Sequence, residues 1–271
     1  MTAFTNHFTF EFRTGIRNRS LLLLNYLFPL AFYMMMGFVM TGINPLFRDV
    51  LLPAMVVFAI YSAAILGLPD PLVQARDAGI FRSYNINGVP KLNILSIPAL
   101  TTSLHLVIVT LIITITAPLL FDAPAPVNWV NFVIVFLATL FAGAGLGVLI
   151  GVVSPNSRST ILLSQLLFLP SMLLGGLMLP YGMLPRAAQI IAQLLPSTHA
   201  MNAFKGLAMG QAADFWPWGS VIILLAGGLT AFGLAFYLFR WDGQHSRRRL
   251  PAAAALLAAL PYAVGIVAFA L

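Results

Sequence analysis

The sequence has 271 residues, of which 60% are hydrophobic and only 8% are charged, and its formal net charge is +7. About a quarter of the residues of an ordinary soluble domain are charged, so this composition excludes a soluble surface. The apolar residues come in blocks of about 20, the length that a helix needs to cross about 30 Å of hydrocarbon. The chain has no cysteine, which excludes disulfides and thiolate metal sites. We therefore predict an all-α, polytopic membrane protein.

Residues 1–20 are predicted to form an amphipathic helix at the membrane interface. Apolar side chains recur at every fourth residue and arginines lie beside them, namely Phe4, Phe8, Phe12 and Ile16 with Arg13, Arg17 and Arg19. An unstructured cytoplasmic tail is the alternative. Because about twenty fairly polar residues precede the first apolar block, no cleavable signal peptide is expected.

Residues 21–240 contain six apolar blocks that are each long enough to span the membrane, at about 21–41, 50–69, 93–120, 129–153, 159–179 and 218–239. The charged segment 70–92 separates the second and third blocks and has to leave the bilayer. Shorter breaks with turn-forming residues follow at 122–126 and 154–158.

Two further regions do not fit the simple pattern of straight spans. Residues 180–217 are only moderately apolar and contain four prolines. We predict a re-entrant helical hairpin there, before the sixth span, because broken backbone at membrane depth has to be covered by protein or line a water-filled cavity. Residues 241–271 are predicted to form a basic linker and an extra C-terminal helix, with a seventh span over 251–271.

The basic residues distinguish the two sides of the membrane. Eleven of the 14 lysines and arginines lie in the N-terminal segment, in 70–92, at Arg158 and in the basic linker, which leaves Arg48, Arg186 and Lys205 on the other side. Cytoplasmic loops carry an excess of Lys and Arg, so the N-terminus is predicted to be cytoplasmic. This placement also accounts for the net charge without a nucleic-acid partner.

Small and polar residues inside the predicted spans suggest packing or cavity roles. Gly143, Gly147 and Gly151 repeat every four residues in the fourth span, which is typical of close helix packing. Polar side chains in a span should face a partner helix or a cavity, and the candidates for cavity lining are Asn25, Thr101, His105 and Gln165. Interhelical hydrogen bonding is the alternative for these four residues.

The sequence carries no catalytic, nucleotide-binding or metal-binding motif. The patterns G-x-x-x-x-G-K-[ST], H-E-x-x-H and G-x-S-x-G are all absent. No carboxylate lies inside a predicted span, which removes the usual group for proton or sodium coupling. If the protein pumps a substrate, its energy has to come from another chain.

The order of these parts resembles the ABC (ATP-binding-cassette) type-2 permease family, in particular its drug-export branch with the type V exporter fold. The more specific match consists of Leu174-Gly-Gly-Leu-Met-Leu-Pro180, Leu184-Pro185, Leu195-Pro196-Ser-Thr-His-Ala-Met and Lys205-Gly-Leu-Ala-Met-Gly210. Residues 76–90 are similar to the coupling segment of that family. Asp77 stands where the family usually has Glu, Arg82 stands where a second acidic residue is common, and residues 251–271 have no counterpart.

The resemblance implies the permease subunit of an exporter in the plasma (inner) membrane of a prokaryote. Its partners would be two copies of a P-loop ATPase, which bind the ATP and Mg, and a second permease chain in a homodimer or heterodimer, with lipid around them. The chain itself would bind no cofactor. The residues implied for ATPase coupling are Asp77, Gly79, Phe81, Arg82, Tyr84 and Pro90, and those for the outer gate and re-entrant hairpin are Gly176, Pro180, Pro185, Pro196 and Lys205.

The residues themselves suggest how the coupling segment would act. Ile80, Phe81 and Tyr84 can share one face of a short helix, and this face is predicted to plug a groove on the ATPase. A solvated loop is the alternative for the segment. For the whole chain, the alternative is a passive channel or a secondary transporter, while an intramembrane enzyme would need paired catalytic groups that the sequence lacks.

Overall fold

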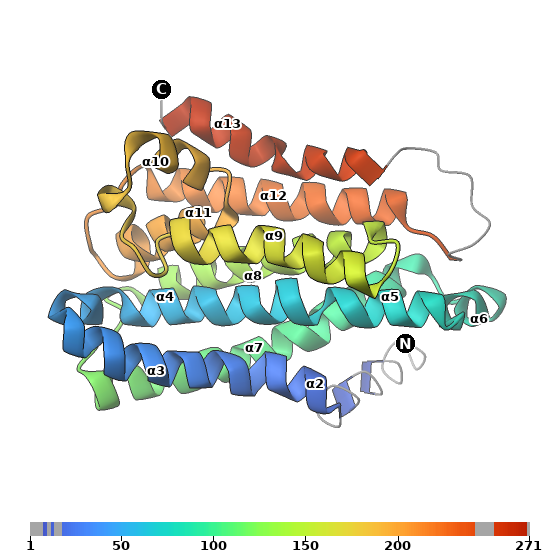
Figure 1. Cartoon of the computed structure of the whole chain (residues 1–271), viewed down its shortest axis with the longest axis horizontal. Helices are drawn as coiled ribbons and strands as arrows, with labels where there is room; N and C mark the ends of the chain where they lie inside the picture. Colours follow the sequence, from blue (N-terminus) through green and yellow to red (C-terminus); the bar gives the residue numbers. More distant parts are fainter. Residues whose placement is uncertain (1–7, 10–11, 14–17, 242–251, 270–271) are drawn as a thin grey trace.

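The computed structural model describes residues 8–9, 12–13, 18–241 and 252–269, and every regular element in these ranges is helical. The long helices lie side by side in one bundle, with the short helix α6 at one end and α10 at the other (Figure 1). We call these the α6 end and the hairpin end. Six segments are long and apolar enough to cross a membrane, namely Arg19–Ile43, Pro45–Asp77, Lys91–Phe121, Trp129–Val153, Ser157–Leu174 and Pro217–Leu238. The all-α, six-span prediction is therefore confirmed.

The first two spans are each assembled from several consecutive helical pieces. The first contains α2 (Arg19–Leu22), the π-helical η1 (Leu23–Leu27) and α3 (Phe28–Ile43). After the 3₁₀ turn η2 (Pro45–Phe47), the second contains α4 (Arg48–Tyr61), the π-helical η3 (Ser62–Gly67) and α5 (Pro69–Asp77). The other spans are α7 (Lys91–Phe121), α8 (Trp129–Val153), α9 (Ser157–Leu174) and α12 (Pro217–Leu238).

The second span is longer than the sequence predicted. Its expected end at residue 69 is wrong, because the helix continues to Asp77 through two prolines, Pro69 and Pro71. Pro69 lies at the first position of α5, where a missing N–H is tolerated. Just before it, the N–H of Leu68 donates to Ala63 O at 3.0 Å, five residues earlier, so the hydrogen-bond pattern shifts by one residue ahead of the proline. A helix of 33 residues is about 50 Å long, so it extends well beyond the hydrocarbon core.

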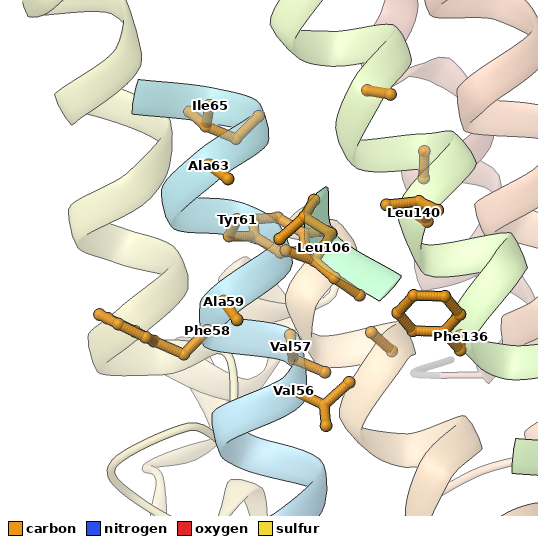
Figure 2. Packing of buried hydrophobic residues seen from close by; sticks show 14 of the residues in the cluster. Val56, Val57, Phe58, Ala59, Tyr61, Ala63, Ile65, Leu106, Phe136 and Leu140 are labelled. Atoms are coloured by element: carbon orange, nitrogen blue, oxygen red, sulfur yellow. The ribbon is translucent and has the colours of Figure 1, made fainter. Parts of the chain in front are cut away.

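Helix α4 is the centre of the bundle. In the most apolar part of its span 89% of the residues are buried, compared with 22% for α9 and 28% for the first span. Figure 2 shows Tyr61 and Val57 of α4 pointing toward Leu106 of α7 and Leu140 of α8. The ring of Phe58 stacks on Phe32 of α3, with 4.0 Å between ring centroids. The helices around α4 keep broad apolar faces for lipid or for a partner chain.

The fifth span is shorter than the predicted block 159–179, because α9 ends at Leu174. Gly176 has a positive φ of 83°, a conformation that glycine adopts without steric cost. A side chain at Gly175 would collide with Ser197, whose Cβ lies 2.8 Å from the position of an added Cβ. These two glycines end the span and bring the next hairpin close to it.

The hairpin lies between the fifth and sixth spans. It contains the 3₁₀ turn η4 (Tyr181–Met183), α10 (Arg186–Ala192), α11 (Pro196–Ala203) and the π-helical η5 (Phe204–Ala208). These short helices gather at the hairpin end of the bundle (Figure 1). The sequence therefore predicted correctly that residues 180–217 would not form one straight helix.

The two chain ends are described only in part. Most of the predicted interfacial helix 1–20 lies outside the described residues, although the Phe12 ring stacks on His105 with 4.7 Å between centroids. The basic cluster Arg247 to Arg249 also lies outside them. The C-terminal segment contains the 3₁₀ helix η6 (Ala252–Ala259) and α13 (Leu260–Phe269), which run beside α12 in the opposite direction (Figure 1).

Candidate functional site

The predicted coupling segment folds into a helical turn at the α6 end. Helix α5 ends at Asp77, and α6 (Ile80–Ile86) follows after Gly79. Gly79 and Gly88 have positive φ values of 74° and 70° and nothing lies within 4 Å of an added Cβ, so they are required by backbone conformation rather than by space. Pro90 then precedes the first residue of α7 in extended conformation.

Phe81 has a different role from the one predicted. Its side chain is only 5% exposed, and its ring lies 5.5 Å from that of Phe239 at the end of α12. The hypothesis that places Phe81 on the partner-binding face is therefore wrong in this respect, because the ring already fills a site within its own chain. Tyr84 is half-buried beside it. Phe81 fixes α6 to the end of the sixth span.

The exposed face of α6 consists of other residues. Ile86 is 78% exposed, Ile80 is 43% exposed, and Arg82 is exposed as well. Ile86 follows Arg82 by four residues, so these two side chains share one face of α6, and Ile80 is exposed on another side of the same helix. The helix lies at the end of the bundle (Figure 1), where it offers an apolar and positively charged contact surface. Arg82 was among the residues implied for ATPase coupling, whereas sequence reasoning missed Ile86.

Arg76 is a further residue that sequence reasoning missed. Its side chain is 8% exposed, and its Nη2 donates to the carbonyl oxygen of Pro155 at 3.2 Å. Its Nε lies 3.3 Å from Oδ1 of Asp77. Arg76 thus joins the end of α5 to the loop between α8 and α9. The one available signal was a basic residue in the last turn of a helix, where cations bind terminal carbonyls.

At the hairpin end, prolines and one ion pair shape the chain. Pro185 immediately precedes α10, and Pro196 is the first residue of α11, the position where proline fits a helix best. Pro180 precedes the turn η4. Nζ of Lys205 lies 2.8 Å from Oδ2 of Asp214, and both side chains are about one-fifth to one-quarter exposed (20% and 24%).

Asn202 holds the connection between α11 and α12. Its Nδ2 donates to the carbonyl oxygen of Phe215 at 2.9 Å and to Oγ of Ser220 at 3.0 Å. Its Oδ1 accepts from the backbone N–H groups of Asp214 (2.8 Å) and Phe215 (3.2 Å). All hydrogen-bonding capacity of one buried amide is therefore used to fix the chain where it enters the sixth span.

His199 lies in the same buried part of α11, outside the six spans. Its Nε2 is 2.9 Å from the carbonyl oxygen of Gln193 and donates to it. Burial lowers the pKa of His199 to about 4, because the uncharged form is favoured where water is excluded. The imidazole is thus neutral at physiological pH and acts as a packing and hydrogen-bonding group.

A small cleft opens beside this hairpin. It encloses about 400 Å³ of space, part of which is open solvent, between the η2 turn, the end of α9 and α11. Its walls are largely apolar, with Phe47, Met178 and Met201, and the Lys205–Asp214 pair lies at its polar side. Gly176, Pro180 and Lys205 of the predicted gate residues line this cleft.

Four polar residues were predicted to line a cavity in the spans, and they come from three parts of the bundle. His105 and Thr101 lie on α7, Asn25 lies in η1 and Gln165 lies on α9. Nδ1 of His105 is 2.7 Å from the hydroxyl of Tyr26, and Thr101 donates to the carbonyl of Ile97 in its own helix at 3.1 Å. The contact of His105 with Tyr26 is an interhelical hydrogen bond of the kind that the alternative interpretation expects, whereas the bond of Thr101 lies within its own helix.

A comparison with known proteins identifies the family to which this chain belongs. A family model described as "ABC-2 type transporter" matches residues 3–209. The chain belongs to the ABC-2 type transporter family. It is also similar to the "Putative transport permease YvfS" of Bacillus subtilis (strain 168), with 26% identity over 234 residues that cover 85% of this chain and 94% of that protein. No solved structure matches the chain. This ABC-2 chain is therefore a transport permease subunit.

The three glycines of α8 form a close contact in this ABC-2 permease. An added Cβ at Gly147 would lie less than 3.0 Å from the carbonyl oxygen of Ala64, and one at Gly143 would lie 3.2 Å from Ile60. One at Gly151 would lie 3.0 Å from Leu72. The contacts move along both helices in the same direction, from Ile60 through Ala64 to Leu72 on the central α4–η3–α5 helix, so the glycines of α8 let two parallel helices approach closely.

Proposed function

We propose that this permease is the membrane subunit of an exporter, in which a separate P-loop ATPase drives alternating access. Two copies of the ATPase and a second permease chain, identical or related, complete the assembly. The observation that carries the proposal is the projecting helix α6, with Ile80, Arg82 and Ile86 exposed, on a family member whose sequence has no nucleotide-binding motif of its own. Force from the ATPase would enter through this surface.

The positions of the acidic residues argue against the alternative of ion-coupled transport. The chain has seven carboxylates. Of the five within the described residues, Asp49, Asp122 and Asp214 lie at the hairpin end, and Asp70 and Asp77 lie in α5 at the α6 end. Ion-coupled transporters usually carry ionisable groups inside their membrane spans, and none of these five described carboxylates lies in the middle of the bundle.

The charge distribution supports an orientation with the α6 end in the cytoplasm. At the hairpin end the described basic residues are matched in number by acidic ones, and two of them form ion pairs, Arg48 with Asp122 (3.6 Å) and Lys205 with Asp214. At the α6 end seven described basic residues outnumber the two acidic ones, Asp70 and Asp77. They are Arg13, Arg19, Arg76, Arg82, Lys91, Arg158 and Arg240. The N-terminus would then be cytoplasmic, in the plasma membrane of a prokaryote.

The composition of the bundle favours a hydrophobic or amphipathic substrate. An isolated charge at the centre of a transmembrane helix costs about 2.5–3.5 kcal/mol on insertion scales. The buried polar groups of the spans are mostly threonines and serines, such as Thr110, Thr139 and Ser164. A path built from such residues would suit a substrate that enters from the cytoplasm or the inner leaflet and carries little charge of its own.

Purification of the tagged chain from membranes of its native host tests the proposal. We expect a P-loop ATPase to copurify and to hydrolyse ATP, at a rate that falls when Ile86→Asp removes the apolar contact of α6. The matched control is Leu46→Asp, because Leu46 is similarly exposed (74%) but lies at the hairpin end. Loss of the ATPase with both variants, or with neither, would contradict the proposed coupling surface.

A further inference from the structure

The C-terminal helix packs against the hairpin end of the chain, outside the residues that the family model matches. That match ends at residue 209. Tyr262 of α13 is buried to 2% exposure and Gly265 is buried as well. The segment 252–269 is therefore an integral part of the packed bundle and not an appended tail.

Glycines on α12 and α13 make this contact close. A Cβ added at Gly227 would collide with the ring and hydroxyl of Tyr262, and one at Gly219 would lie 2.5 Å from the Phe269 ring. One at Gly265 would lie 2.7 Å from Cδ1 of Ile223. From contact to contact the residue number rises by four along α12 and falls by three or four along α13. The two helices are therefore antiparallel and fit together along one face of each.

The same helix reaches past α12 to the re-entrant hairpin. Five rings, which we call the hairpin cluster, join α13 to it: Tyr181, His199, Phe215, Tyr262 and Phe269. Phe269 stacks on Phe215 with 5.3 Å between centroids and a 20° interplanar angle. Phe215 makes edge contacts with His199 (5.5 Å) and Tyr181 (5.8 Å). Tyr262 lies 5.9 Å from His199. Aromatic pairs at these separations stabilise beyond their buried area.

The contact places α13 directly against His199, whose ring lies 5.9 Å from that of Tyr262 and 6.5 Å from that of Phe269. An added Cβ at Gly265 would lie 3.2 Å from Cε1 of His199. His199 is fully buried although its helical segment, α11 and the adjoining η5, is short (Pro196–Ala203 and Phe204–Ala208). A short helix has too few internal hydrogen bonds to be stable alone, so its position depends on what packs against it.

We propose that residues 252–269 act as an intramolecular clamp that holds α11 and the hairpin in place through Tyr262 and Phe269. Eight 3₁₀ residues at about 2.0 Å each and ten α-helical residues at about 1.5 Å each reach about 31 Å. This length allows the clamp to extend along α12 and to end beside the hairpin. The clamp does not depend on the proposed ATPase coupling.

The cysteine-free sequence allows a direct test by thiol labelling of the full chain in detergent. Ser197→Cys places a nearly isosteric, fully buried thiol in α11, and Ser62→Cys places one in the core at η3. Gly227→Leu should displace Tyr262 and raise the maleimide labelling rate at position 197 about tenfold or more, without changing the rate at position 62. Gly233→Leu is the matched control, because nothing lies within 4 Å of an added Cβ there.

Compensating and milder variants separate the clamp from a general packing defect. Adding Tyr262→Ala to Gly227→Leu vacates the space that the leucine needs, so labelling at position 197 should be slower than in Gly227→Leu alone. Phe269→Ala, which removes a ring without overpacking, should also raise the rate at position 197. Equal rates in Gly227→Leu and Gly233→Leu, or equal increases at positions 62 and 197, would overturn the proposal.

Discussion

The contact between α8 and the central helix gives the sharpest prediction for stability. We consider Gly147→Ala. The added Cβ would lie 3.0 Å from the carbonyl carbon of Ala64 and still closer to its oxygen, whereas ordinary van der Waals contact begins at 3.4 Å. The obstacle is backbone, so no rotamer change can relieve it, and the two helices have to separate along their whole contact. Overpacking of this kind typically costs about 1–3 kcal/mol.

A matched pair of variants isolates this packing cost. Replacing a helical glycine by alanine also gains about 0.8–1.0 kcal/mol of helix propensity, which would mask part of the loss at Gly147. Gly233→Ala makes the same change in α12 with open space around it. The difference in unfolding free energy between the two variants should therefore be about 1–3 kcal/mol, measured by reversible denaturation in mixed micelles.

The order of effects along α8 provides the refutation. Gly143→Ala should cost less than Gly147→Ala, because the nearest atom at Gly143 is a side-chain methyl of Ile60 at 3.2 Å that can move. If Gly147→Ala were as stable as Gly233→Ala, the close backbone contact between α8 and the central helix would not exist in the detergent-solubilised protein.

Three further predictions follow from the two ends of the bundle. Asn202→Leu should destabilise the fold by about 2–4 kcal/mol, because the N–H groups and the carbonyl that bind the amide would lose their partners. A thermal melt in detergent measures this loss, and an unchanged melting temperature would contradict it. Folding stability should fall as the pH drops from 6.5 towards 4. The reason is that the pKa of His199 is lowered to about 4 in the folded protein, so the unfolded chain takes up the proton first. His199→Gln should flatten this pH dependence, and an equal slope in both proteins would refute the explanation. Phe81→Ala should lower the unfolding free energy by about 3 kcal/mol, as other buried Phe→Ala changes do, whereas the exposed control Ile86→Ala should leave it unchanged. Equal losses in the two variants would show that Phe81 is not the residue that fixes α6.

Much of the helical pattern could be predicted from composition and length. The spans at 129–153 and 218–239 agree with α8 and α12 to within one residue, because turn residues bound each apolar block on both sides. The predicted ends at 69 and 179 were wrong for local reasons. The π-helical segment η3 allows the second span to continue past Pro69. The positive φ of Gly176 ends the fifth span before the end of its apolar block.

The contacts between distant parts of the chain could not be predicted. Phe81 has the same apolar character whether it binds a partner or packs on Phe239, and only the fold distinguishes these roles. The spacing of Gly143, Gly147 and Gly151 indicated a packing face without naming Ala64 as its counterpart. The ring contacts of His199 could not be predicted either, because Phe215, Tyr262 and Phe269 belong to other parts of the chain.

The central claim is that an ATPase binds this permease at the exposed face of α6, and site-directed crosslinking tests it most directly. Ile86→Cys and Asp122→Cys each place one thiol in an otherwise cysteine-free chain. Ile86 is the last residue of α6, and Asp122 follows α7 and pairs with Arg48 at the hairpin end. With a short maleimide–photoreactive crosslinker in native membranes, Ile86→Cys should form an adduct with a subunit that binds ATP, and Asp122→Cys should not. An ATP-binding adduct from Asp122→Cys, or none from Ile86→Cys when the complex is intact, would contradict the account.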